Sequence, residues 1–369
     1  MRGMTMLLVV YSHVCHFCMG DFAMGGNDVM FLFRMPCFFF ISGWLFYGVG
    51  KRHMDSDGAA LSPQGGSRRG AYVWSVVRHK ARVQLVPTVI FLVLLVGLWC
   101  ISNDAPFLTT FVGSLGATKG GYWFTVTLFE FFLLYIIGVR GISAIVVSIA
   151  AFAYDVNYAW LVANHPLPFV YDVLGFLGVM TWRFYIFFFL GTLAHKHFDA
   201  FQRLCNSPLF LASVAVAFVG AVLLLPATNA WLCCLRFLVG GVAGMTLVFA
   251  CFRWLGTSEN RQRTHADSLG TKERSIWRWL RFVGTRTLDI YLLHYFFLPR
   301  QLLSLVPALR GESELFALAP IFRSCPGLPA VAVVIVVTLA VVAVCLLMSA
   351  LLRRSHFLAY WLFGAKRNL

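Results

Sequence analysis

About ten stretches of this chain are apolar over enough length to cross a lipid bilayer. A helix needs about 20 predominantly apolar residues to span the hydrocarbon core. The bilayer offers no water to satisfy backbone N–H and C=O groups, so only helices and closed barrels can cross it. The stretches lie at about 3–22, 29–49, 84–102, 122–139, 142–162, 170–194, 208–225, 230–252, 281–303 and 329–352. The sequence therefore predicts an all-α, polytopic transmembrane bundle of about ten helices.

Composition and charge support a membrane protein and argue against a nucleic-acid-binding one. The chain is 60% hydrophobic and 12% charged, whereas soluble proteins carry about a quarter charged residues. A net charge of +15 is compatible with nucleic-acid binding. The basic residues, however, lie in the segments between apolar stretches, which is the distribution that sets the orientation of membrane helices.

The basic residues are concentrated in alternate loops, which predicts the topology. Lys and Arg cluster at 50–82, 195–206 and 253–280 and in the C-terminal tail, while the intervening loops have few or no net charges. Loops rich in Lys and Arg stay in the cytoplasm, so both termini are expected there, in agreement with an even helix count. We expect one membrane-embedded domain over 1–369, with flexible cytoplasmic loops at about 50–82 and 253–280.

Two ionisable residues share one face of the first apolar stretch. His13 follows Arg2 by eleven residues. At about 100° per residue, their side chains differ by about 20° in direction. His13 lies roughly 16 Å further along the helix axis, close to the middle of a hydrocarbon core about 30 Å thick. An ionisable group at that depth is costly and points to a functional site.

Further ionisable groups are expected near the depth of His13. Arg34 lies in the second apolar stretch and Glu130 in the fourth, so the three side chains can meet in one hydrated cavity. His13 can act as a general base, because imidazole titrates near neutral pH, or it can be a hydrogen-bonded packing residue. Glu130 is either functional or the charge partner of a buried arginine.

Four more polar residues have simpler interpretations. Arg183 and Arg236 are expected closer to the outer interface, where they can extend their charged ends toward water. Asp289 and His294 share the ninth stretch, and Asp289 can pair with Arg286 one turn before it.

Neither a metal site nor a disulfide framework is expected. The segment Cys15–Cys18 has C-x-x-C spacing without a second distant pair, which is weak support for a metal. Most of the cysteines lie inside apolar stretches and are expected to be packing residues. Aromatic side chains near the outer face form an interfacial belt or a surface on which a sugar stacks, and these are Tyr122, Trp123, Trp160 and Trp182.

Four segments of the chain resemble a known family of membrane enzymes. They are RGMTMLLVVYSH at 2–13, FRMPCFFFISG at 33–43, YWF at 122–124 and GTRTLDIYLLH at 284–294. Their order and sequences resemble the acyltransferase-3 family of integral-membrane O-acyltransferases. Two departures stand out: Arg34 occupies a position where members often have His, and Arg2 directly follows Met1 whereas members usually have several residues before this Arg.

The resemblance implies an enzyme of the bacterial cytoplasmic (inner) membrane. Such enzymes transfer an acyl group, commonly acetyl, from cytoplasmic acyl-CoA to a hydroxyl of a cell-surface polysaccharide or lipid-linked sugar. The Arg and His of the first motif, here Arg2 and His13, are the essential pair in the family. The resemblance leaves open whether His13 acts as a base or carries the acyl group transiently.

The chemistry of thioester attack suggests roles for the catalytic candidates. The reaction needs a base and a group that stabilises the developing oxyanion. We expect His13 to be the base and Glu130 to orient it. Arg34, a fixed cation, or a neighbouring donor would stabilise the oxyanion.

The donor acyl-CoA carries phosphates that basic side chains can bind. Arg2, Lys51, Arg52 and Arg78 are the candidates, since guanidinium and ammonium groups pair with phosphate. Each of the three loop residues alone is equally explained as a charge that sets topology. Two other functions remain open. One is a proton-coupled transporter or exporter of a glycan or small metabolite, with Glu130, Asp289 and the histidines in a proton relay. The other is a scaffold or receptor without catalysis.

Overall fold

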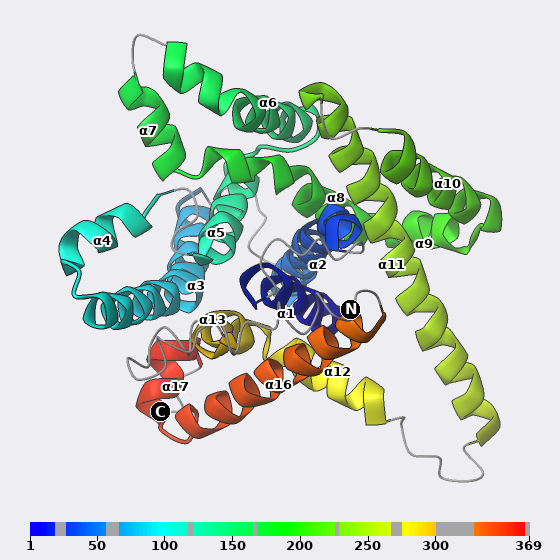
Figure 1. The fold of residues 1–369 in the computed structure, drawn as a ribbon. Helices are drawn as coiled ribbons and strands as arrows, with labels where there is room; N and C mark the ends of the chain where they lie inside the picture. The colour runs from blue at the N-terminus through cyan, green and yellow to red at the C-terminus, as the bar shows by residue number, and fades with distance from the viewer. Residues whose placement is uncertain are drawn as a thin grey trace. The chain divides into compact units, whose positions relative to one another are not determined.

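The computed structural model is helical almost throughout and has no β-strand among the residues that it describes (Figure 1). Those residues are 1–18, 27–56, 66–116, 121–164, 168–225, 229–266, 275–299 and 328–365. The all-α prediction is therefore confirmed.

The described helices are labelled in chain order in Figure 1. In order they are α1 (Arg2–Cys18), α2 (Asn27–Ser56), α3 (Gly66–Asn103), α4 (Phe107–Ser114), α5 (Trp123–Ile136), α6 (Ile142–Asn164), α7 (Pro168–Phe176), the 3-10 helix η2 (Val179–Phe184), α8 (Tyr185–Lys196), α9 (Phe198–Asn206), α10 (Pro208–Leu224), α11 (Ala230–Ala266), α12 (Ser275–Thr285), α13 (Thr287–Phe297), α16 (Leu328–Leu352) and α17 (His356–Phe363).

Four of the described helices are long and apolar enough to cross a membrane, namely α2, α3, α11 and α16. A fifth span results if α9 and α10, which meet at a bend of 80°, count as one. Shorter apolar helices occur in α5 and α6. The count of about ten spans and the cytoplasmic position of both termini stay predictions.

Helix occupies most of the two segments that were expected to be flexible loops. Helix α2 continues to Ser56 and α3 begins at Gly66, so only the middle of the expected loop at 50–82 lies outside the described residues. Likewise, α11 continues to Ala266 and α12 begins at Ser275. The loop boundaries were set where the apolar stretches end, but Lys, Arg, Met and Ala are good helix formers in water as well.

One expected continuous helix, 170–194, is instead three helices. Gly178 follows α7 with a φ of 71°, in the left-handed region that ends an α-helix. The chain then forms η2 before α8 begins at Tyr185. Two side chains of η2 bind neighbouring helices, Trp182 to Glu130 of α5 and Arg183 to Asp155 of α6.

The chain divides into two compact units, each built from separate parts of the sequence. The first comprises Met1–Ser12, Ala23–Tyr47 and Phe187–Thr287. The second comprises His13–Phe22, Gly48–Ile186 and Leu288–Leu369.

Glycines bring helix backbones into direct contact within the first unit. A Cβ added at Gly43 of α2 would collide with the carbonyl oxygen of Phe188 in α8, and one added at Gly191 of α8 would collide with that of Phe40. Small residues allow such close approach where lipid gives no hydrophobic drive to association.

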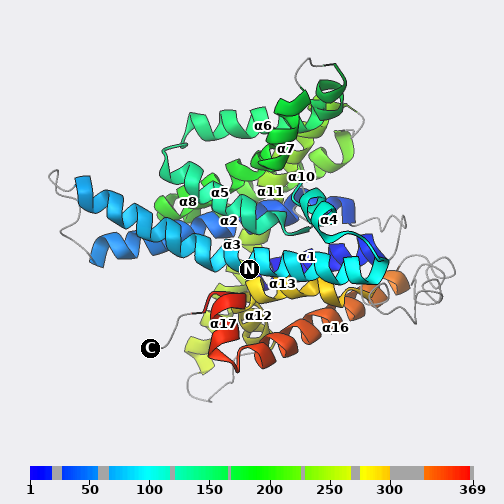
Figure 2. The same cartoon turned by 90° about the vertical axis from the view of Figure 1, so that its left-hand side faces the viewer.

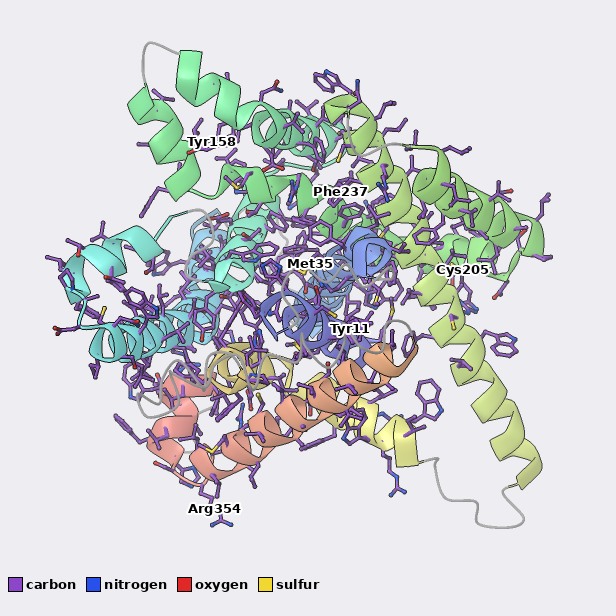
Figure 3. The ribbon with its side chains drawn as sticks, viewed as in Figure 1. Tyr11, Met35, Tyr158, Cys205, Phe237 and Arg354 are labelled. Carbon is purple, nitrogen blue, oxygen red and sulfur yellow. The ribbon has the colours of Figure 1, made fainter. Side chains whose placement is uncertain are left out.

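Helix α11 packs against both of these helices. A Cβ at Gly241 would lie 3.2 Å from the ring of Pro36 and 2.6 Å from that of Phe187. Phe187 also meets Phe237 edge to face, with 5.5 Å between ring centroids. Phe237 and Met35 of α2 are both buried in this unit and are labelled in Figure 3.

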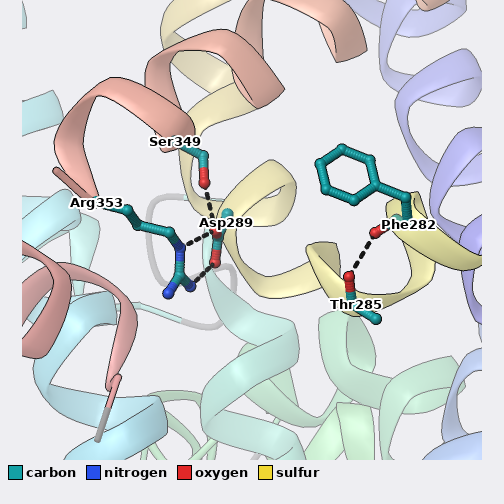
Figure 4. Close-up of polar contacts among 5 residues, drawn as sticks. All are labelled: Phe282, Thr285, Asp289, Ser349 and Arg353. Carbon is teal, nitrogen blue, oxygen red and sulfur yellow. Dashed lines mark hydrogen bonds and ion pairs between the residues drawn. The ribbon is translucent and has the colours of Figure 1, made fainter. Parts of the chain in front are cut away.

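The second unit contains a buried carboxylate that joins two helices. α13 and α16 lie side by side in both views of the fold (Figures 1 and 2). Asp289 of α13, for which the sequence suggested Arg286 as partner, accepts two hydrogen bonds of 2.8 Å from Arg353 and a further one from Ser349 (Figure 4). Because Asp289 is only 2% exposed, this fork-shaped pairing compensates for the loss of its hydration.

Substitution of Gly43 by Ala should destabilise the first unit. The new methyl group has no room beside the Phe188 backbone, and such overpacking costs about 1–3 kcal/mol. Thermal unfolding of the purified protein in detergent measures the effect. Gly220→Ala in α10 is the matched control, since nothing lies within 4 Å of its added Cβ, and it should leave stability unchanged or raise it by up to about 1 kcal/mol. Equal stability of Gly43→Ala and wild type would contradict the packing.

Replacing Arg353 by Met should lower stability by about 3 kcal/mol, because the Asp289 carboxylate then remains buried without its main cation. The double variant Asp289→Asn with Arg353→Met should recover much of that loss. Arg354→Met is the control, since Arg354 is exposed and points away from the helices in Figure 3. Losses that simply add in the double variant would argue against a direct pair.

Candidate functional site

His13, the proposed catalytic residue, contacts a second histidine. Its Nδ1 lies 2.7 Å from Nε2 of His294, and the two rings stack with 4.9 Å between centroids and 17° between planes. His13 is half-buried on α1, and His294 is fully buried on α13. The contact therefore joins the last residues of two motif segments, 2–13 and 284–294.

His294 was not among the site residues expected from the sequence. It was recognised only as a polar group in an apolar stretch and as the end of a motif. The useful signal was that both motif segments end in a histidine inside an apolar helix. Which two histidines meet, however, depends on packing between helices that are far apart in the sequence.

The other nitrogen of His294 faces the main chain of its own helix. Nδ1 lies 2.7 Å from the carbonyl oxygen of Tyr291 and 3.1 Å from that of Ile290. Aromatic rings enclose the pair: the Tyr295 ring is centred 4.2 Å from that of His294 and 5.2 Å from that of His13, and Phe17 meets His13 edge to face at 5.8 Å.

A short segment before α5 fixes the tyrosines of α13. The hydroxyls of Tyr291 and Tyr295 both donate to the carbonyl oxygen of Gly121, at 3.1 Å each. Tyr122 donates in turn to the carbonyl of Leu292 at 2.8 Å. Gly121 has a φ of 96°, and any Cβ there would lie 2.7 Å from the Tyr295 ring, so only glycine fits. The motif segments 122–124 and 284–294 are thus directly bound to each other.

Arg2 lies at the start of α1, in the first unit. Its guanidinium donates a hydrogen bond of 3.0 Å to Thr287 Oγ1, and the side chain is otherwise exposed. Gly3 allows α1 to approach α12 so closely that an added Cβ would collide with the Leu280 carbonyl oxygen. A guanidinium has five N–H donors, so Arg2 can bind an anion while it keeps the bond to Thr287.

Arg34 is a buried residue of α2, only 6% exposed, and its guanidinium carbon lies 5.6 Å from the centre of the Phe31 ring. It belongs to the first unit, whereas His13 and Glu130 belong to the second. Their meeting in one cavity stays a prediction.

Glu130 is half-buried on α5 and accepts a hydrogen bond of 2.8 Å from Nε1 of Trp182. Its proposed role in orienting His13 stays a prediction. The next residue of η2, Arg183, was expected to extend toward water but instead forms an ion pair with Asp155 of α6. The short helix η2 therefore carries a polar contact to each of two neighbouring helices.

For the remaining phosphate-binding candidates the structure gives a position on a helix but no contact that supports the role. Lys51 and Arg52 lie in the last turns of α2, with side chains outside the described residues, and Arg78 is exposed on α3. No group of three His, Cys, Asp or Glu side chains arranged to hold a metal occurs in the part of the chain that the structure describes.

The comparisons with known proteins identify the family. Searches of curated proteins and of solved structures found no match to this chain. A family model described as an acyltransferase domain matches residues 1–350 of the 369, a range that contains all four motif segments. The chain therefore belongs to the acyltransferase-3 family and is an acyltransferase with apolar helices of membrane-spanning length.

Proposed function

We propose that this protein is a membrane O-acyltransferase. It transfers an acyl group, acetyl in the simplest case, from cytoplasmic acyl-CoA to a hydroxyl of a cell-surface polysaccharide or lipid-linked sugar. Its setting is the bacterial inner membrane, with both termini cytoplasmic and 1–369 acting as one domain. The observation that supports this most is the hydrogen-bonded pair of His13 and His294, formed by two motif segments within the matched acyltransferase domain.

In the proposed reaction His13 acts as a general base. It takes the proton of the acceptor hydroxyl while the oxygen forms a bond to the carbonyl carbon of the thioester. The carbon–sulfur bond then breaks, and the CoA thiolate leaves with its electron pair. The His13 imidazolium returns the proton to the thiolate, so the enzyme ends in its starting state. Proton transfer of this kind contributes about 10²–10⁴-fold to a rate.

Two other side chains have proposed roles at the reacting centre. Arg34 carries a permanent positive charge and would stabilise the oxyanion that forms on the thioester carbonyl, a contribution of about 10²–10³-fold when one donor supplies it. Glu130 would orient His13. Its bond with Trp182 supports a fixed carboxylate position, as an orienting group requires.

Arg2, Lys51, Arg52 and Arg78 are proposed to bind the phosphates of acyl-CoA. The guanidinium of Arg2, held on one side by Thr287, suits bidentate pairing with a phosphate. No metal has a role in this scheme. The acyltransferase domain favours it over the alternative of a proton-coupled transporter, in which flux would depend on a proton gradient and ignore acyl-CoA.

Replacement of His13 by Ala should abolish transfer, since it removes the base. Membranes that contain either form are incubated with radiolabelled acetyl-CoA and total surface glycan from the source bacterium. We expect label in glycan with wild type and at least about 100-fold less with His13→Ala. His16→Ala, an exposed histidine one turn further along α1, is the matched control and should retain activity.

Two outcomes would count against parts of this proposal. Equal label with wild type and His13→Ala would show that His13 is not the base. Absence of label with both would exclude acetyl-CoA as the donor, and a panel of other acyl-CoAs then decides between another acyl group and transport.

Arg2→Ala should raise the KM for acyl-CoA about 10- to 100-fold with a small effect on kcat, because a hydrogen bond to a charged group contributes about 1.5–3 kcal/mol. Thr287→Val is the control that removes the bond between the two residues but keeps the guanidinium, and its KM should stay near the wild-type value. Initial rates over a range of acyl-CoA concentrations give both constants. An unchanged KM in Arg2→Ala would contradict phosphate binding by Arg2.

A further inference from the structure

We propose that His294 is a positioning residue that fixes which nitrogen of His13 accepts the proton. The structure assigns Nδ1 of His13 as the donor to Nε2 of His294, so that Nε2 of His13 is the basic nitrogen. This inference rests on the proposed function, because it concerns the base of the same reaction.

The first step concerns the protonation of His294. A neutral imidazole carries its hydrogen on one nitrogen and a lone pair on the other. Nδ1 of His294 faces two carbonyl oxygens, at 2.7 Å and 3.1 Å. Carbonyl oxygens can only accept hydrogen bonds, so this nitrogen must carry the hydrogen. The tautomer follows from the hydrogen-bond network, and Nε2 of His294 is left with a lone pair.

The second step carries this assignment to His13. Its Nδ1 lies 2.7 Å from Nε2 of His294. Two lone pairs at this distance would repel each other, so Nδ1 of His13 must carry the hydrogen. In the neutral ring the lone pair of His13 is then on Nε2. The hydrogen bonds run in one direction, from His13 through His294 to the carbonyl of Tyr291.

The surroundings of His294 keep this arrangement in place. The side chain has no exposed surface, and the rings of Tyr295 and Tyr291 are centred 4.2 Å and 5.8 Å from it. Both tyrosine hydroxyls are bound to Gly121. A flip of the His294 ring about its Cβ–Cγ bond would put the carbon Cδ2 in the place of Nδ1 and the carbon Cε1 in the place of Nε2. Both bonds of the chain would then be lost. The enclosing rings oppose such a flip.

This arrangement has a chemical consequence for proton transfer. In enzymes with a catalytic triad, the group that orients the base is a carboxylate, which also stabilises the imidazolium. Here the group bonded to Nδ1 of His13 is a neutral imidazole, itself bound to a main-chain carbonyl. It fixes the direction of the His13 lone pair and adds no negative charge of its own. The bond at Nδ1 therefore leaves the proton on Nε2 of His13 able to pass to the departing CoA thiolate.

The tautomer can be read directly from the wild-type protein. The chain has ten histidines, so nitrogen-15 NMR of protein labelled in histidine is compared with the same spectrum of His13→Gln to identify the His13 signals. We expect Nδ1 of His13 to be protonated and Nε2 to be unprotonated at a pH where the ring is neutral. The opposite assignment would overturn the proposal, and no variant of His294 has to fold for this result.

Kinetics of two His294 variants test the role in catalysis. The side-chain oxygen of Gln can take the place of Nε2 and accept from His13, whereas Leu cannot. We expect His294→Leu to lower kcat at least about tenfold, as loss of a supporting hydrogen-bond partner commonly does. His294→Gln should recover most of that loss, and both variants should keep the wild-type KM for acyl-CoA.

The outcomes separate this inference from the proposed function. Full kcat in His294→Leu, with transfer still lost in His13→Ala, would overturn the positioning role alone. An equal loss in the Leu and Gln variants that both melt at the wild-type temperature would also overturn it. A wild-type protein with the expected tautomer but no transfer from any acyl-CoA would overturn the proposed function instead.

Discussion

A single main-chain oxygen, that of Gly121, holds the helix that carries His294. Two tyrosines of α13 donate to it, and the neighbouring Tyr122 bonds back to the same helix through Leu292. The position of the His294 ring, and through it the direction of the His13 imidazole, depends on this contact. Gly121 has a positive φ and lies against the Tyr295 ring. A side chain at this position would push Tyr295 away and so disturb the packing around His294 and His13.

The apolar stretches were sufficient to predict an all-α chain, because helix formation in such a stretch depends on residues that are close in sequence. Contacts between helices could not be predicted from the sequence in this way. Nothing in a helical period connects His13 with His294, or Asp289 with Arg353, since these pairs form only when segments far apart in the sequence pack together. For the same reason the partner assumed for Asp289 was the nearest arginine in sequence. The ends of apolar stretches were also a poor guide to helix ends, because basic residues continue a helix in water.

Three polar side chains in the helices of the second unit share a pattern, in which each is bound by a group from another helix. Asp289 binds Arg353, Arg183 binds Asp155, and Glu130 binds Trp182. Burying such groups is costly unless they are paired. The pairs therefore restrict which helix faces can meet, and they do so at positions where apolar side chains alone would allow several alternatives.

The glycines that join α2 to α8 have a different consequence, for motion. At each glycine the two helix backbones touch, and there is no room for a Cβ atom. The neighbouring residues have side chains, so none of them could take the position of the glycine. A slide of one helix along the other by even one residue would push a Cβ into a carbonyl oxygen, as at Gly43 and Gly191. Helices α2 and α8 are therefore held in register in the first unit, and a displacement of α2 along its axis around Gly43 would move the contacting part of α8 with it.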